Sequence, residues 1–294
     1  MNLYVSTSCL QGKGDVFDIL DTYLKAGITN VELGTGKQPV AMLSNIKNYA
    51  CNFVVHHYFP PPRDAFIVNL ASQDKKLLAR SRKQIKASIE FCHRYHSKLF
   101  TFHAGFRADP DSTFRFPAKG PIAPYQKAFN TFVESVKEIN AYAEMRGVKL
   151  AIENNVLSEN NFLEGKNQFL LLCEAIEFEQ LWDQIQTSNV GLLLDIGHLK
   201  VTSTSLKYDK HAFIEKVKHK IFALHINDNN GRTDSHTAIT KESWCLEILR
   251  RNNFMNIPII LESSNDTIEQ IVEQIRLIDT MLPCDRAPEQ LSYV

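Results

Sequence analysis

The chain has 294 residues, of which 44% are hydrophobic and 22% charged, and its formal net charge is zero. This composition is typical of a soluble globular protein, and the neutral charge argues against a large nonspecific nucleic-acid footprint. No apolar run reaches the roughly 18 residues of a transmembrane helix, no basic segment precedes the first apolar stretch, and the six cysteines include no C-x-x-C pair, so we expect a cytoplasmic protein with free thiols.

Apolar, strand-like runs alternate with amphipathic, helix-like patterns along the whole chain. Strands are predicted at residues 3–6, 30–33, 53–57, 99–103, 149–153, 191–195, 221–225 and 258–262. The helices predicted after them lie at residues 16–26, 41–47, 74–95, 124–146, 178–185, 211–217, 241–250 and 267–281. Near-continuous apolar strands are typical of a parallel sheet covered by helices. Eight such units predict an α/β fold, a (β/α)8 TIM barrel, with residues 1–294 as a single domain.

The alternative is an open, doubly wound sheet, but no G-x-G-x-x-G turn follows the first predicted strand. Three loops that follow strands are unusually long, at residues 58–70, 104–124 and 154–169. Loops after the strands of a parallel barrel lie on the face that carries the active site, and long loops in compact domains are usually lids or binding loops. We therefore expect these three loops on the rim of a site.

Seven of the eight predicted strands end in a histidine or a carboxylate residue. These residues are Glu32, His56 with His57, His103, Glu153, Asp195, His225 and Glu262. A parallel barrel gathers these strand ends around one opening, and burying so many unpaired polar groups together is costly without a cation. The pattern therefore predicts a metal site of nitrogen and oxygen ligands for Zn, Mn, Fe or Co.

Four of these residues, on successive strands, are the predicted ligands of one divalent ion: Glu153, Asp195, His225 and Glu262. Five further residues add ligands for a second or third ion, as is typical of phosphoester chemistry: His56, His103, His198, Asp234 and His236. Asp234 and His236 flank Ser235, so both can point the same way from an extended loop.

Each of these residues also has a simpler interpretation when taken alone. A single strand-end histidine is more often a hydrogen-bonded structural residue than a ligand, and Glu32 either orients a ligand or binds substrate. Adjacent strand residues face opposite ways, so only one of His56 and His57 is expected to face inward. Four basic residues on or near the rim loops are candidates for a phosphate clamp, although simple solvation is expected for each one singly: Arg63, Arg107, Arg232 and Lys241.

The order and spacing of five short segments resemble the xylose-isomerase-like TIM-barrel superfamily. The segments are Ile152-Glu153-Asn154-Asn155, Leu194-Asp195-Ile196-Gly197-His198, Leu224-His225-Ile226-Asn227-Asp228, Asp234-Ser235-His236 and Ile260-Leu261-Glu262-Ser263. This superfamily contains sugar and sugar-phosphate isomerases and epimerases, and also endonuclease IV-type DNA-repair enzymes. The resemblance covers essentially the whole chain.

The resemblance to the isomerases implies one Mn²⁺-like ion on Glu153, Asp195, His225 and Glu262, with the two glutamates as acid and base in proton transfer through an enediolate. The resemblance to the endonuclease IV-type enzymes implies three zinc ions on all nine candidate ligands. It also favours His56 over His57, because His56 keeps a His-x-x-x-Pro spacing to Pro60.

Two departures from the nuclease pattern decide the leading hypothesis. Thr237-Ala238-Ile239-Thr240 stands where that family has Leu-Gly-x-Gly. The loop at residues 34–39 is short and has no evident set of residues that would penetrate DNA. The leading hypothesis is an isomerase or epimerase that uses one to three Zn or Mn ions and acts on a small sugar or sugar phosphate, with Glu153 and Glu262 catalytic.

The alternative is a zinc-dependent phosphoesterase or abasic-site nuclease, for which nucleic acid would be the substrate. A third hypothesis is a metal-binding barrel without catalysis. A closed pocket with a lid from residues 104–124 would favour the isomerase, and a basic groove across the rim the nuclease.

Overall fold

The computed structural model describes residues 2–10, 12–34, 40–116, 120–254 and 256–282. Parallel strands close into a barrel in the order β1-β10-β9-β8-β5-β4-β3-β2. Their bounds are β1 Leu3–Ser6, β2 Asn30–Leu33, β3 Asn52–His56, β4 Leu99–His103, β5 Lys149–Glu153, β8 Val190–Asp195, β9 Ile221–Ile226 and β10 Ile259–Leu261. The predicted (β/α)8 TIM barrel is therefore confirmed.

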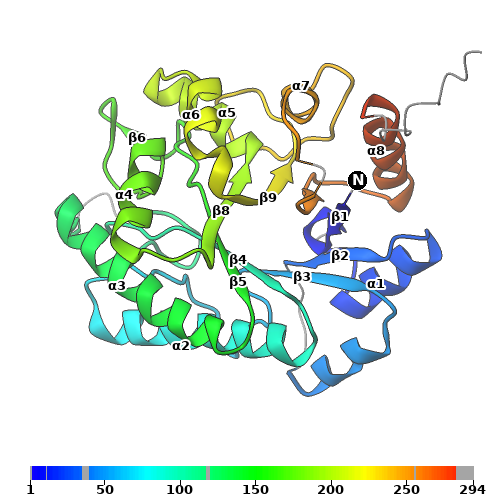
Figure 1. The fold of residues 1–294 in the computed structure, drawn as a ribbon, viewed down its shortest axis with the longest axis horizontal. Coiled ribbons are helices and arrows are strands. Elements are labelled where there is room, and N and C mark those ends of the chain that lie inside the picture. Colours follow the sequence, from blue (N-terminus) through cyan, green and yellow to red (C-terminus); the bar gives the residue numbers. More distant parts are fainter. Residues whose placement is uncertain (1, 11, 35–39, 117–119, 255, 283–294) are drawn as a thin grey trace, which may run out of the picture.

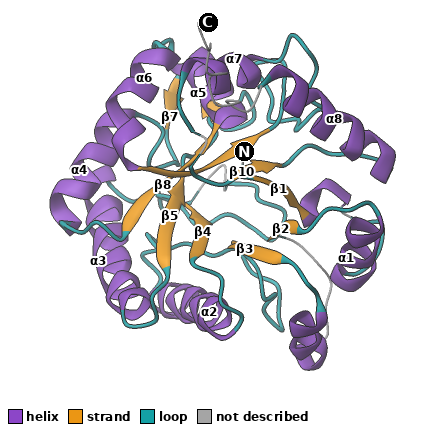
Figure 2. Cartoon of the chain, turned by 45° about the vertical axis from the view of Figure 1, so that its right-hand side comes forward, coloured by secondary structure: helices purple, strands orange, loops and turns teal. Residues whose placement is uncertain are grey.

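Helices surround the barrel on its outer side (Figure 1), and the strands gather in the middle when the chain is turned (Figure 2). Their bounds are α1 Val16–Lys25, α2 Lys75–Arg94, α3 Tyr125–Glu144, α4 Ala175–Ile185, α5 Ile196–Leu206, α6 Lys210–Val217, α7 Trp244–Arg251 and α8 Ile268–Met281. Side-chain caps fix several starts. Asp74 accepts from the first turn of α2, and Thr267 forms a capping box with Gln270 at α8.

The structure departs from the predicted elements in three places. Helix α5 follows β8 directly and was not predicted, because its Val-Thr-Ser-Thr-Ser stretch lacks a helical apolar period. The expected helix at residues 41–47 is instead a 3-10 helix, η2 (Val40–Asn48), and short 3-10 helices also occur as η1 (Thr7–Leu10) and η3 (Lys218–Lys220). The loop after β5 contains a small antiparallel hairpin, β6 (Phe162–Leu163) with β7 (Lys166–Asn167).

Apolar side chains fill the barrel and the layer between barrel and helices. One buried cluster takes residues from six strands: Val54, Leu99, Ala151, Leu193, Ala223 and Ile260. A much larger cluster joins the outer faces of the strands to the helices. The described cysteines, Cys9, Cys51, Cys92, Cys173 and Cys245, are free, as expected, and all but Cys51 are buried; Cys284 lies outside the described residues.

A third apolar cluster lies under the rim loops and ties two of them together. Phe106 and Ala108 from the loop after β4 pack against Leu157 and Phe169 from the loop after β5. The backbone N–H of Arg107 donates to the carbonyl of Phe169, with 2.6 Å between nitrogen and oxygen. These two loops therefore form one packed wall above the strand ends.

Within the part of the chain that the structure describes, every helix is too short or too polar to cross a bilayer.

Candidate metal centre

The carboxylate of Glu153, at the end of β5, is the hub of the strand-end residues. Its Oε2 lies 2.8 Å from Nδ1 of His103 and 3.6 Å from Nε2 of His56. Its Oε1 lies 3.3 Å from Nδ1 of His225 and 3.5 Å from Nδ1 of His198. The two oxygens thus face different histidines, so this one carboxylate can serve two neighbouring ion positions.

Four groups of side chains in the described part of the chain each offer ligand atoms that lie within 4.8 Å of one another; one is Glu32, His56 and His225, and the other three are the candidate ion positions. We call them the four-ligand group (Glu153, Asp195, His225 and Glu262), the His103 group (His56, His103 and Glu153) and the loop group (His198, Asp234 and His236). Together they contain all nine residues that the sequence singled out. Glu153 belongs to two groups, and Oδ2 of Asp195 lies 3.8 Å from Nε2 of His198 and 3.8 Å from Nδ1 of His225.

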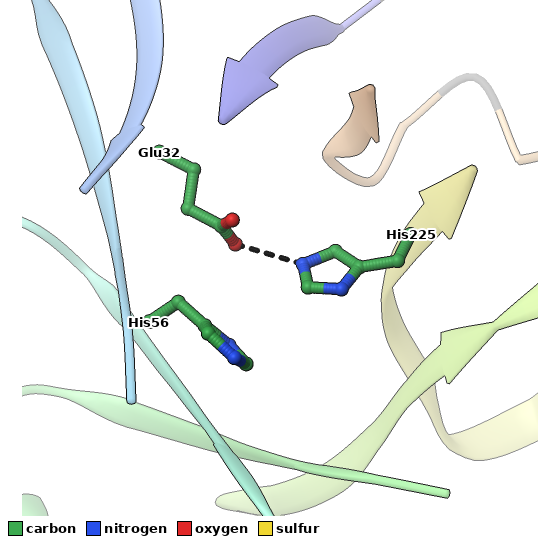
Figure 3. A group of neighbouring side chains, drawn as sticks. All are labelled: Glu32, His56 and His225. Atoms are coloured by element: carbon green, nitrogen blue, oxygen red, sulfur yellow. Dashed lines mark hydrogen bonds and ion pairs between the residues drawn. The ribbon is translucent and has the colours of Figure 1, made fainter. Parts of the chain in front are cut away.

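A second hydrogen bond orients each of four histidines. Nε2 of His225 lies 2.9 Å from Oε2 of Glu32, and Figure 3 shows these side chains pointing toward one another from β9 and β2, beside His56. The other three histidines are oriented through Nδ1 instead. Nδ1 of His56 lies 2.8 Å from Thr101 Oγ1, that of His198 lies 2.9 Å from the Asn154 carbonyl, and that of His236 lies 2.8 Å from the Glu262 carbonyl. The other ring nitrogen of each histidine faces a carboxylate of the cluster. Metal-binding histidines are typically held in this way.

Asp195 has two roles at the junction of β8 and α5. Its Oδ1 accepts from the backbone N–H of His198 at 2.7 Å and so caps the helix. Its Oδ2 accepts from the amide of Asn227 at 3.2 Å and faces His198 and His225. The side chain of Asn154 holds the backbone of Asp195 at two points: its Oδ1 accepts from the Asp195 N–H at 2.9 Å, and its Nδ2 donates to the Asp195 carbonyl at 3.1 Å. The helix start therefore fixes which oxygen faces the cluster.

Electrostatics at the centre favour added positive charge. Burial alone would lower the pKa of His225, but Glu262 and Glu32 outweigh it and hold that pKa well above its ordinary value. Burial also opposes the charge of His198, yet Asp195 and Asp234 raise its pKa well above normal. The carboxylates therefore create a negative electrostatic potential, which bound protons or a metal cation would neutralise.

Burial has the opposite effect on the carboxyl of Asp195, whose pKa it raises. For Glu262, burial is outweighed mainly by His225, and the pKa falls to about 2.

The residues present fit a divalent cation on their own chemistry. Asp234 Oδ1 is buried and makes no hydrogen bond within the described residues, a costly arrangement unless a cation satisfies it. Glu153 Oε2 and His225 Nδ1 are also buried, and each faces an oppositely charged partner at 2.8 Å, His103 and Glu262 respectively. Neutral imidazoles and carboxylates are the ligands that Zn and Mn accept. The four-ligand group would hold one ion, and the other two groups would hold further ions.

Two residues that the sequence left open have definite places. Glu32 is fully buried against His225, so it orients that histidine. His57 accepts at its Nδ1 from the backbone N–H of His103, 3.3 Å away, and stacks on Tyr58, whereas the ring of His56 faces Glu153. Three orienting residues were not predicted, namely Thr101, Asn154 and Asn227. Thr101 could have been found, because it shares the inward face of β4 with His103.

A cavity of about 850 Å³ opens from the centre toward the rim loops. Its inner residues include His103, His198 and Asp234, and its outer ones come from residues 113–116 and 155–163. The loop at residues 104–124 therefore lies on its rim, as expected; of that loop, residues 117–119 lie outside the described part.

Basic side chains are scarce around this cavity. Among the described lining residues, Arg115 is the one with a cationic side chain. None of the four basic residues proposed from the sequence lines it, and the guanidinium of Arg107 instead donates to the Ala123 carbonyl at 3.1 Å. Of the loop at residues 34–39, which was expected to have no evident residues that penetrate DNA, residues 35–39 lie outside the described residues.

Comparison with known proteins finds relatives of two kinds. A family model described as xylose isomerase-like TIM barrel matches residues 24–281. The chain is 27% identical over 292 residues to an uncharacterized protein of Methanocaldococcus jannaschii, covering 97% of this chain and 96% of that protein. It is also 27% identical over 221 residues to a probable endonuclease 4 of Phocaeicola vulgatus, covering 70% and 71%. Among solved structures, a D-tagatose 3-epimerase-like protein superposes with a TM-score of 0.75 at 19% identity, covering 96% and 97%.

Proposed function

The chain belongs to the xylose isomerase-like TIM-barrel family, and on that premise we propose that it is a divalent-metal-dependent isomerase or epimerase of a sugar or sugar phosphate. The observation that carries this proposal is the cavity of about 850 Å³, lined in part by the loop after β4 and bordered by His103 and His198 of the centre. Such a cavity suits a small molecule, whereas a nuclease needs a groove rich in Lys and Arg.

We propose that two carboxylates of the four-ligand group exchange a proton with a bound substrate. Oε2 of Glu262 and Oε1 of Glu153 lie 2.8 and 3.3 Å from the same atom, Nδ1 of His225. The side chain of Glu262 is 14% exposed and that of Glu153 only 1%. Ser8 donates to Oε1 of Glu262 at 3.2 Å and so fixes the direction of the carboxylate. We therefore assign to Glu262 the first proton transfer and to Glu153 the return.

A divalent ion held by the four-ligand group would supply a Lewis acid that lowers the charge cost of an enediolate. His225 is held for that purpose by Glu32, and Asp195 by the helix start and Asn227.

Deuterium exchange tests the proposal directly. A panel of ketoses, aldoses and their phosphates is incubated with the enzyme in deuterated water, and deuterium at carbons next to the carbonyl is measured by NMR. We expect incorporation with the wild-type protein and none with Glu262→Gln or Glu153→Gln, while both variants stay folded. The exposed Glu242→Gln is the matched control and should exchange at the wild-type rate.

A second candidate function, a metal-dependent phosphoesterase, has one specific observation in its favour. Glu153 is shared by two groups, and Asp195 stands between His198 and His225, which suits a cluster of ions of the kind that clamps phosphoryl oxygens. An oligonucleotide with an abasic site is therefore added to the same assay. Its cleavage, without deuterium entering any sugar, would replace the isomerase by this second function.

A further inference from the structure

The outer half of the cavity is shaped for more than a monosaccharide. Its volume of about 850 Å³ lies in the upper part of the range for ligand sites, about 300–1,000 Å³. Only its inner end meets His103, His198 and Asp234, and the remainder extends outward to Phe114 and Leu163. We propose that this outer half binds the base and phosphate of a nucleotide, so that the substrate is a sugar carried on a nucleotide. This inference rests on the proposed isomerase or epimerase function.

An aromatic wall makes up one side of the outer half. Phe116 stacks on Phe169 with ring centroids 4.6 Å apart, and Phe106 meets both Phe114 and Phe116 edge-on, at 5.9 and 5.5 Å. All four rings line the cavity. A nucleotide base has a flat π-face that stacks on such rings whatever its sequence identity. Phe106 and Phe169 are themselves buried, so the rings open to a ligand are those of Phe114 and Phe116.

Phe114 is the most unusual residue of the wall. It keeps 45% of its surface exposed although it is large and apolar, and its backbone has a φ of 63°. A bulky residue other than glycine rarely takes this left-handed conformation, which costs energy and tends to occur at ligand sites. Folding gains little from an exposed ring held in this way, so we assign the ring to stacking on a bound base.

Polar groups in the same half suit the remainder of a nucleotide. Arg115, next to Phe114, is the cation among the described lining residues, and a guanidinium is a strong partner for a phosphate. Another lining residue is Asn161, whose Oδ1 is buried without a hydrogen-bond partner in the described part of the chain, while its amide nitrogen donates to the Val156 carbonyl at 3.0 Å. That oxygen can accept from an N–H of a base or a hydroxyl of a ribose.

Binding of mononucleotides tests the subsite without any turnover. UMP, AMP and ribose 5-phosphate are titrated calorimetrically into protein purified without chelator. We expect both mononucleotides to bind at least about ten times more tightly than ribose 5-phosphate, because only they present a base for stacking. Arg115→Gln should weaken all three, since all three carry a phosphate.

Substitutions at position 114 separate the ring from the backbone. Phe114→Asn removes the ring but tolerates the left-handed conformation, and should cost about tenfold in mononucleotide affinity without affecting ribose 5-phosphate. Phe114→Tyr keeps the ring and should bind as the wild type does. Ile176→Asn removes another exposed apolar side chain, on α4 and outside this cavity, and should change nothing.

Three results would overturn the subsite. The first is equal affinity for the mononucleotides and ribose 5-phosphate, or no effect of Phe114→Asn. The second is a p-nitrophenyl glycoside that binds as tightly as UMP and is insensitive to Arg115→Gln, which would assign the wall to a neutral aglycone. The third is a single-stranded oligonucleotide that binds more than a hundredfold tighter than UMP, which would assign it to nucleic acid. Failure of deuterium exchange with mononucleotide binding intact would refute the proposed reaction and leave the subsite standing.

Discussion

Glu32 and His225 lie 193 positions apart in the chain, yet their side chains meet inside the barrel with 2.9 Å between Oε2 and Nε2. Both are fully buried, so the contact fixes the ring and leaves Nδ1 facing Glu262 and Glu153. Glu32 thus has the place of the carboxylate that typically supports a metal-bound histidine.

Removing this support should weaken metal binding. Glu32→Gln keeps a hydrogen-bond acceptor but loses the charge, and we expect metal affinity to fall about 10–100-fold. Glu32→Ala should in addition lower the free energy of unfolding by about 1–3 kcal/mol, because a buried ring nitrogen loses its partner. Competition with a chromophoric chelator measures the affinity. Unchanged affinity in Glu32→Gln would show that the contact is purely structural.

The number of bound ions should exceed one. Elemental analysis of protein purified without chelator should give two or three equivalents, because the four-ligand, His103 and loop groups share only Glu153. His103→Ala should lower the count by one while the four-ligand group keeps its ion, and His225→Ala should remove the ion of that group. His96→Ala, at an exposed position, serves as the control. A single equivalent that survives His103→Ala would contradict a multi-ion centre.

Gly197 should be intolerant of a side chain. A Cβ at this position would collide with the side-chain amide of Asn227, whose nitrogen donates to Asp195 at 3.2 Å. Gly197→Ala should therefore destabilise the protein by about 1–3 kcal/mol and also weaken metal binding, because Asn227 must move away from Asp195. Urea denaturation and chelator competition measure the two effects. Adding Asn227→Ala to Gly197→Ala should recover part of the stability, and a purely additive pair would rule out the collision.

Asp228 should contribute stability that acid removes. Its carboxylate accepts from Lys200 Nζ at 2.7 Å and from Ser243, and so anchors the loop that carries Asp234 and His236. Burial would raise the pKa of Asp228, but these hydrogen bonds outweigh it and lower the pKa. The folded state then binds fewer protons than the unfolded one, so the contribution is complete above the ordinary value of about 3.9. It is lost as the pH falls through the lowered folded pKa.

Comparison of Asp228→Asn with the wild type isolates the contribution of the Asp228 carboxylate to the free energy of unfolding. At pH 7 the variant should be less stable by about 1 kcal/mol, a modest figure because the ion pair is partly exposed. The difference should shrink as the pH is lowered below the ordinary carboxyl range. Asp266→Asn removes the largely exposed pair with Lys13 and should show almost no difference at either pH. A constant difference across the pH range would exclude the linkage.

The sequence by itself determined the barrel fold and which side chains gather at the ends of its strands. Apolar periodicity located the strands, and the rule that parallel strands present their C-terminal ends at one opening placed Glu153, Asp195, His225 and Glu262 together. This placement holds whichever strand neighbours which. For the same reason the set could include His198, three residues after Asp195, and Asp234, in the loop after the strand that ends at His225, although the sequence did not show that His198 lies in a helix.

The tertiary structure decided the partners of each residue. The contact of Glu32 with His225, the two-sided role of Glu153 and the support of His56 by Thr101 depend on strand register around a closed barrel, and local sequence carries no record of register between distant strands. The cavity likewise depends on two loops that pack on each other through Phe106 and Phe169. Long-range packing of this kind is why Arg115, and none of the basic residues chosen from the sequence, lines the cavity.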